Sequence, residues 1–88
     1  MDPFVWDEAK NAENLARRGL SFSLVYEMDW DAVRYDDDIR FDYGEGRVRA
    51  FGRINGKPYC VVIAPRDGTI RVITVRRMHE KEAQHYDI

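Results

Sequence analysis

Two dipeptides in the second half of the chain, Asn55-Gly56 and Asp67-Gly68, place the strongest constraint on the fold. Asn-Gly and Asp-Gly readily supply the positive φ angles of a two-residue hairpin turn, and each lies between β-rich runs. They predict a meander of three antiparallel strands near residues 47–54, 58–64 and 69–76. The middle strand is almost entirely apolar, which is typical of a central strand covered on both faces.

The turns also predict which residues lie opposite each other. With a two-residue first loop, Phe51 faces Cys60 and Arg49 faces Val62; with a two-residue second loop, Val62 faces Ile73 and Tyr59 faces Arg76. One predicted face carries Arg47, Arg49, Phe51, Arg53, Cys60, Val62, Ala64, Arg71, Ile73 and Val75. The other carries Val48, Ala50, Gly52, Ile54, Tyr59, Val61, Ile63, Val72, Thr74 and Arg76. A β-bulge would exchange the two faces for every residue beyond it.

Capping residues predict two helices before the meander. Asp7 is a suitable N-cap for a helix from Glu8 to Arg18, which Gly19 ends. The apolar positions of this helix form a narrow stripe that is expected to pack on the sheet: Ala9, Ala12, Leu15 and Ala16. Ser21 is expected to cap a second, shorter helix near residues 22–28, whose candidates for burial are Phe22, Val25 and Tyr26.

Short strands and a terminal helix complete the predicted order. Phe4 to Trp6 suits an edge strand of the same sheet, Trp30 to Tyr35 a further strand, and Asp36 to Asp38 a turn. Met78 to Ile88 predicts a terminal helix. The order of elements predicts one α+β domain over residues 1–88, in which an antiparallel sheet carries two N-terminal helices and a C-terminal helix.

The formal net charge of −2 conceals a division of charge along the chain. Residues 27–46 hold eight acids and two arginines, a net charge of −6, whereas residues 47–81 hold nine bases and two acids, a net charge of +7. Arginine dominates the basic half, and its planar guanidinium favours bidentate contacts to phosphate or carboxylate. A nucleic acid or an acidic partner is one interpretation. The other is a sheet whose arginines pair with the chain's own aspartates.

Several other classes of protein fit the composition poorly. The one cysteine, Cys60, lies in the most apolar run, which predicts a core residue and no internal disulfide. The run Asp36 to Asp38 lacks the later glycine and glutamate of a calcium loop, so we expect no metal and no cofactor. There is no apolar run of about 18 residues. The acidic N-terminus is unlike a signal peptide, and we therefore expect a cytoplasmic protein without a membrane segment.

The order and spacing of several short motifs resemble one known family over nearly the whole chain. The front matches the W-D-x-x-K-x-x-x-N-x-x-K-H-G-x-S-F pattern of BrnT toxins at Trp6-Asp7, Lys10, Asn14, Arg17-Arg18-Gly19 and Ser21-Phe22. The second half is similar to the family at Tyr43-Gly44-Glu45-Gly46-Arg47, at Gly52-Arg53 and at Arg71 to Arg76, which resembles its R-I-I-S-A-R strand. Glu82 and Tyr86 match the E-x-x-x-Y of its last helix.

The resemblance implies a RelE-like fold and a ribonuclease toxin that cleaves RNA and arrests translation. It also implies a cognate BrnA-like antitoxin, which forms a hetero-oligomer with the toxin and provides the only contact to operator DNA. The expected catalytic residues are Arg47, Arg53, Arg76, Glu82 and Tyr86. The expected RNA-binding residues are Lys10, Arg17, Arg18, Arg49, Arg71 and Arg77. Cleavage without a metal needs cations over the developing phosphorane charge, which the arginines would provide.

One position departs from the family pattern in a way that bears on catalysis. Arg18 occupies the place of the family's histidine, so a group suited to proton transfer at neutral pH is replaced by a permanent cation. The alternative function is therefore a catalytically weak or inactive BrnT-like binding module that acts with the antitoxin in operon repression. Turnover of RNA separates the two, because phosphate affinity falls with salt in both.

Overall fold

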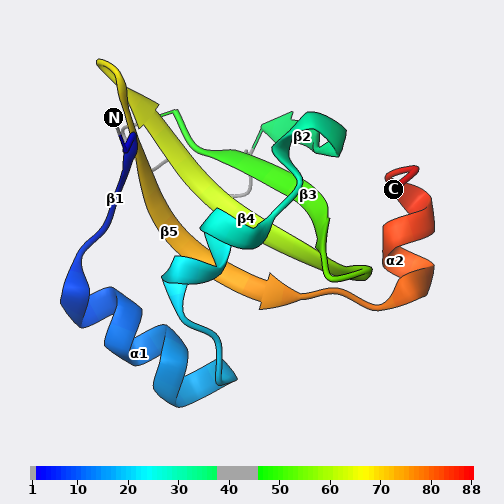
Figure 1. Ribbon diagram of the computed structural model, residues 1–88, viewed down its shortest axis with the longest axis horizontal. Helices are drawn as coiled ribbons and strands as arrows, with labels where there is room; N and C mark the ends of the chain where they lie inside the picture. Colours follow the sequence, from blue (N-terminus) through cyan, green and yellow to red (C-terminus); the bar gives the residue numbers. More distant parts are fainter. Residues whose placement is uncertain (1, 38–45) are drawn as a thin grey trace.

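The predicted meander forms the centre of a five-stranded sheet in the computed structural model, which describes residues 2–37 and 46–88 (Figure 1). In chain order, the elements are β1 (Phe4–Val5), α1 (Glu8–Arg18), η1 (Phe22–Glu27), η2 (Trp30–Ala32), β2 (Arg34–Asp37), β3 (Val48–Ile54), β4 (Lys57–Arg66), β5 (Thr69–Arg77) and α2 (Glu80–His85), where η denotes a 3-10 helix. The strand order is β1-β5-β4-β3-β2, so the apolar β4 is central as predicted. The α+β class is confirmed.

Both hairpin turns form at the dipeptides that predict them. Asn55 and Gly56 have φ angles of 50° and 78°, and Asp67 and Gly68 have 48° and 83°. Positive φ at both central positions matches the right-handed twist of the two flanking strands. The local chemistry of four residues therefore sets where β3 ends, where β4 begins and ends, and where β5 begins.

The expectation of a fully antiparallel sheet is wrong at one edge. β1 joins the sheet, as predicted for Phe4 to Trp6, but it runs parallel to β5 with Phe4 opposite Ile70. The Ile70 amide donates to the Pro3 carbonyl at 2.7 Å. Two residues carry no information about the direction of their partner strand. That direction depends on where the connecting chain places β1, which is a tertiary property.

The register of β3 with β4 is the predicted one, whereas that of β4 with β5 changes at a bulge. Phe51 lies opposite Cys60, and Ala64 lies opposite Arg71, as two-residue turns require. The register then shifts between Val62 and Ile63, so that Arg76 lies opposite Cys60 instead of Tyr59. The predicted faces of residues 74–76 are therefore wrong. The bulge turns Val75 into the core and brings Arg76 to the face of Phe51 and Cys60.

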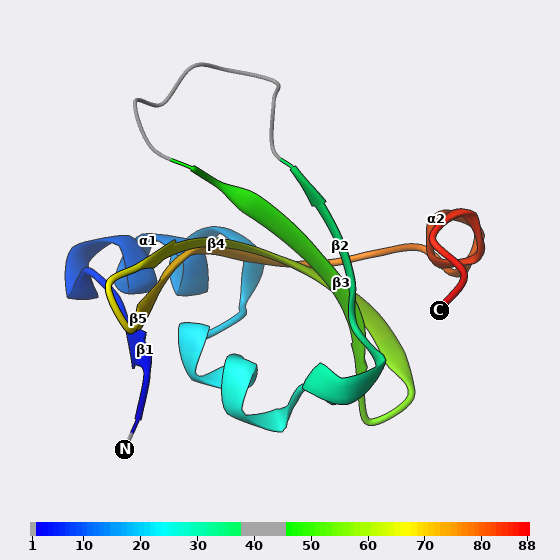
Figure 2. The same cartoon turned by 90° about the horizontal axis from the view of Figure 1, so that it is seen from above.

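The main core lies between the sheet and the chain that covers one of its faces. Figure 2 shows η1 and η2 on the same side of the sheet, and α1 and α2 at opposite ends of the molecule. Phe22 and Val25 of η1 are fully buried against this face. Their sheet partners in the core cluster are Ala50, Ile54, Tyr59, Val61, Ile63, Val72 and Val75. The opposite face of β3, β4 and β5 therefore remains for other contacts.

α1 has the predicted bounds but not the predicted packing. Asp7 caps it, Gly19 ends it in the left-handed conformation, and the alanine and leucine stripe is exposed, with Leu15 at 51%. The helix is attached through Asn14, which is 6% exposed and donates through Nδ2 to the carbonyls of Leu20 and Val75 at 2.9 and 3.0 Å. The side-chain amide of Asn14, and not the apolar stripe, therefore holds the helix against the sheet.

The remaining elements are shorter than predicted or differ in type. Ser21 caps the second helix as expected, but that helix is 3-10, and Tyr26 is 52% exposed. Trp30 begins a 3-10 turn instead of a strand, and Asp36 and Asp37 lie in β2 instead of a turn. The segment 38–45 is outside the described residues. α2 covers only the middle of the predicted terminal helix. No helix among the described residues has both the length and the apolar character needed to cross a membrane.

Candidate active site

A set of arginines lies on the sheet face opposite η1, which we call the arginine face. Cross-strand pairing places Arg49, Val62 and Thr74 in one row and Phe51, Cys60 and Arg76 in the next. Three buried apolar residues form a cluster on the same face: Val62, Ala64 and Ile73 are 5%, 4% and 8% exposed. Arg71 pairs with Ala64 and so joins the same face, and Arg47 precedes β3 with the side-chain parity of Arg49.

Arg76 forms a bidentate ion pair with Glu82 of α2. Its Nη1 lies 3.3 Å from Oε1, and its Nη2 lies 2.9 Å from Oε2. The hydrogen bonds from Arg76 lower the pKa of Glu82, partial desolvation opposes this effect, and the charge of Arg76 adds to it. The carboxylate is therefore ionised at neutral pH. About a third of each side chain remains exposed, at 32% for Arg76 and 34% for Glu82.

A stack of two aromatic rings lies beside this ion pair. Tyr86, at the end of α2, stacks on Phe51 with ring centroids 3.7 Å apart and planes inclined by 10°. Phe51 is fully buried and belongs to a small cluster with Cys60, Met78 and Ala83. This cluster fixes α2 on the arginine face. The prediction that Cys60 is a core residue is confirmed.

Arg49 of β3 completes the group. Its guanidinium carbon lies 5.4 Å from the Phe51 ring centroid, and Nη2 lies 2.6 Å from Oδ2 of Asp36. Its Nε is buried and has no hydrogen-bond partner among the described residues. The interpretation that the chain's own aspartates pair with its arginines is thus correct for Arg49. The basic and acidic halves of the sequence meet at this point.

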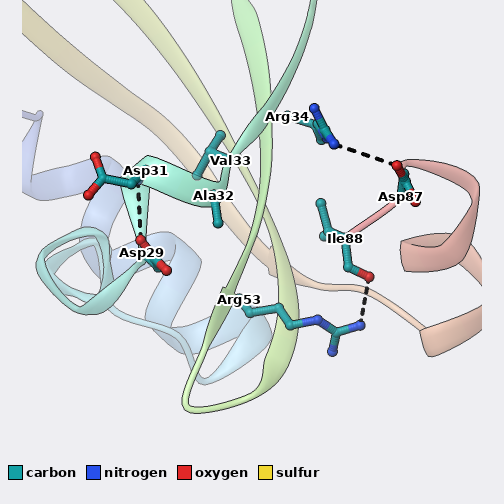
Figure 3. A pocket seen from close by; sticks show the side chains of 8 residues that line it. All are labelled: Asp29, Asp31, Ala32, Val33, Arg34, Arg53, Asp87 and Ile88. Atoms are coloured by element: carbon teal, nitrogen blue, oxygen red, sulfur yellow. Dashed lines mark hydrogen bonds and ion pairs between the residues drawn. The ribbon is translucent and has the colours of Figure 1, made fainter.

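Arg53 lies on the same face of β3 as Arg49 and Phe51, two residues after Phe51 and close to the Asn55-Gly56 turn. It is six positions after Arg47, which corresponds to about 20 Å along a strand. Nη1 donates to the Gly56 carbonyl at 2.8 Å and to both oxygens of Glu80 at 2.7 and 3.1 Å. Nη2 donates to the Ile88 carbonyl at 3.0 Å, across a pocket of 390 Å³ (Figure 3). Arg34 and Asp87, which also line this pocket, pair at 3.5 Å.

The cations of α1 divide into two groups. Lys10 and Arg17 line a pocket of 220 Å³ between α1 and the arginine face. The other lining residues are Glu13, Asn14, Arg47, Ile73 and Thr74. Arg18 is exposed at the end of the helix and is not among the lining residues.

Arg77 does not share a face with the other predicted site residues. It pairs with Tyr59, and its guanidinium carbon lies 5.5 Å from the Tyr59 ring centroid on the η1 side of the sheet. The structure therefore gathers Arg49, Arg76, Glu82 and Tyr86 around Phe51, with Arg47 and Arg71 on the same face. Arg53 also lies on this face, but its guanidinium is paired with Glu80. Arg18 and Arg77 lie apart from the group.

Two contributors to the site were not predicted, Phe51 and Asp36. The predicted register puts Phe51 on the same face as Arg49, and this could have identified Phe51 as part of the site. Its stacking with Tyr86 depends on where α2 docks. Asp36 was expected in a turn. Its contact with Arg49 follows from the pairing of β2 with β3, in which these two residues lie opposite each other.

Comparison with known proteins agrees with the motif order. No curated protein matches the chain. The model of one family, described as the ribonuclease toxin BrnT of type II toxin-antitoxin systems, matches residues 6–82. That span begins at Trp6 and ends at Glu82, and it includes the arginine face and the first turn of α2. The chain belongs to the BrnT family of ribonuclease toxins of type II toxin-antitoxin systems.

Proposed function

We propose that this toxin cleaves RNA on the arginine face, at Arg76, Glu82 and Tyr86, without a metal ion. The observation that carries the proposal is the bidentate Arg76–Glu82 pair beside the Phe51–Tyr86 stack. A guanidinium held by a carboxylate is oriented before substrate arrives, so it loses little freedom when it binds a phosphate. An aromatic ring at the same place offers a surface for a base.

The proposed reaction is an internal transesterification. The 2′ oxygen attacks the adjacent phosphorus, the bond from phosphorus to the 5′ oxygen breaks, and the products carry a 2′,3′-cyclic phosphate and a 5′ hydroxyl. Arg76 stabilises the negative charge of the phosphorane. The ionised Glu82 accepts the proton of the 2′ hydroxyl, and the phenol of Tyr86 donates one to the 5′ oxygen that leaves. This assignment does not need the histidine that Arg18 replaces.

We assign roles to the other cations from their positions in the fold. Arg47, Arg49 and Arg71 share the arginine face and would bind phosphates on either side of the scissile one. Lys10 and Arg17 extend that surface onto α1. Arg53 is assigned to holding the C-terminus against the β3–β4 hairpin, because its donors already serve a carboxylate and two carbonyls. Arg18 and Arg77 are not included in the site.

The partner of this toxin follows from its family. A type II system pairs a toxin with a protein antitoxin, and we propose a BrnA-like antitoxin that forms a hetero-oligomer with this chain and alone contacts operator DNA. We also propose that the fold is RelE-like, that residues 1–88 act as one domain in the cytoplasm, and that RNA cleavage arrests translation. A small mixed sheet with a terminal helix docked beside an arginine cluster supports this view.

The test is cleavage of an end-labelled RNA by the purified toxin, with and without EDTA. We expect fragments that end in a 2′,3′-cyclic phosphate, unchanged by EDTA and lost in Arg76→Ala and Glu82→Gln. Lys57→Ala is the matched control, because Lys57 is an exposed cation at the start of β4, outside the proposed site. RNA binding without turnover in the wild type would contradict the proposal and support the alternative of a binding module. Activity abolished by EDTA would contradict its metal-free chemistry.

A further inference from the structure

The pocket between α1 and the arginine face is bounded by a strand on one side and a helix on the other. One wall is β5, through Ile73 and Thr74 at the bulge, and the other is α1, through Lys10 and Arg17. Asn14 lines the pocket and also fastens α1 to β5 through its hydrogen bond to the Val75 carbonyl. The spacing between the two walls is therefore fixed by a buried contact.

The charge of this pocket favours an anion. Its lining includes three cations, Lys10, Arg17 and Arg47, and one carboxylate, Glu13. Glu13 pairs with Arg17 at 3.5 Å, but about two thirds of each side chain is exposed, so this pair contributes little that a ligand would have to displace. The ammonium group of Lys10 has no ion pair or hydrogen bond with any residue in 2–37 or 46–88. Thr74 adds a hydroxyl that can donate to an oxyanion.

The pocket lies one step along β5 from the proposed reaction centre. Thr74 and Arg76 are on the same strand and point to the same face, so their Cα atoms are about 7 Å apart. An extended single strand of RNA bound with one phosphate at Arg76 would carry its neighbouring phosphate into this region.

We propose that this pocket is a second phosphate subsite, which binds the RNA phosphate adjacent to the scissile one and uses Lys10 as its main cation. The inference rests on the proposed function, because it takes the scissile phosphate to lie at Arg76. Its consequence concerns the substrate: efficient cleavage requires an oligonucleotide with at least two phosphates. A dinucleotide joined by one phosphate occupies only the reaction centre.

The kinetic test compares short substrates built around a mapped cleavage site. The three substrates are the dinucleoside monophosphate and the same dinucleotide with one added phosphate at its 5′ or its 3′ end. For the wild type, one of the two added phosphates should raise kcat/KM by about tenfold, as expected for one charge-assisted hydrogen bond. In Lys10→Ala and Lys10→Gln this gain, measured as the ratio of kcat/KM with and without the added phosphate in the same variant, should fall to less than about twofold. Lys10→Arg and the control Lys57→Ala should retain it.

A binding measurement keeps the inference testable apart from catalysis. A fluorescent 2′-deoxy oligonucleotide cannot undergo the internal reaction, and its affinity is measured against salt concentration. Loss of one phosphate contact in Lys10→Ala should reduce the slope of log K against log salt by about 0.7, as for a single strand. An unchanged slope, or no gain from either added phosphate, would overturn the subsite. Absence of cleavage with a reduced slope would reject the proposed reaction and retain the anion site.

Discussion

The guanidinium of Arg76 donates two hydrogen bonds to the carboxylate of Glu82, with Nη1–Oε1 and Nη2–Oε2 distances of 3.3 and 2.9 Å. The contact joins β5, the last strand in chain order, to α2. Glu82 follows Arg76 by six positions. It exists because the bulge in β5 turns Arg76 to the face on which α2 docks. The same pair can serve catalysis or merely attach the helix, and the two roles predict different mutant behaviour.

Arg76→Ala should lower RNA cleavage by about a hundredfold or more, because it removes an oriented donor from the charge that develops in the transition state. The melting temperature should stay close to that of the wild type, since the ion pair is about a third exposed and solvent screens it. Both quantities are to be measured on the same preparations. A large loss of stability with unchanged cleavage per folded molecule would assign Arg76 to the scaffold.

The stability that Glu82 contributes should depend on pH in the acid range. Its pKa in the folded protein lies below its ordinary value of 4.5, chiefly because Arg76 donates to the charged form. The contribution is therefore fully present above pH 4.5 and is lost as pH falls through the lower, folded pKa. We expect the difference in melting temperature between wild type and Glu82→Gln to be largest at pH 7 and to shrink below pH 4.5. A difference that stays constant down to pH 3 would contradict this role.

Arg53→Ala should reduce stability more than it reduces catalysis. The substitution removes an ion pair and two hydrogen bonds that are largely exposed to solvent, which should cost about 0.5–1.5 kcal/mol of unfolding free energy. Cleavage per folded molecule should remain near the wild-type value. Urea unfolding and single-turnover cleavage measure the two effects, and Arg66→Ala, an exposed cation at the end of β4, should change neither. A large loss of cleavage at wild-type stability would restore Arg53 to the site.

Gly52→Ala should destabilise the toxin, whereas Gly46→Ala should not. A Cβ at Gly52 would lie 2.9 Å from Val33 Cγ2 and 3.1 Å from Met28 Sδ, in the core beneath the segment that leads to β2. Such overpacking costs typically about 1–3 kcal/mol. A Cβ at Gly46 meets nothing within 4 Å, so its substitution should lie within about 0.5 kcal/mol of wild type. Equal effects in chemical unfolding would show that the contacts at Gly52 relax without cost.

The cognate antitoxin should raise the melting temperature of the purified toxin. A partner that binds only the native state at a hundredfold excess over its Kd adds about 2.7 kcal/mol. For a protein of this size, that corresponds to a shift of about 10 °C or more. Differential scanning fluorimetry at increasing antitoxin concentration measures it. A melting temperature unchanged at saturation would contradict the proposed pairing.

The sequence alone determined the parts of this protein that depend on neighbours in the chain. The turns at Asn55-Gly56 and Asp67-Gly68 and the caps at Asp7 and Ser21 formed where predicted, because positive φ angles and capping hydrogen bonds are properties of a few adjacent residues. The order of the motifs likewise identified the family. Glu82 and Tyr86 could be singled out because their spacing matches its last helix.

Which side chains meet depends on contacts between residues that are distant in the chain. The bulge between Val62 and Ile63 reversed the face of Arg76, because a shift of one residue moves every later side chain to the other side of a strand. The side of α1 that packs was decided by the buried hydrogen bonds of Asn14, which outweigh an apolar stripe that is narrow and made of small residues. The partners of Phe51 and Arg53 follow from the docking of α2. That docking depends on burial and packing between residues that are distant in the chain, and no local pattern encodes it.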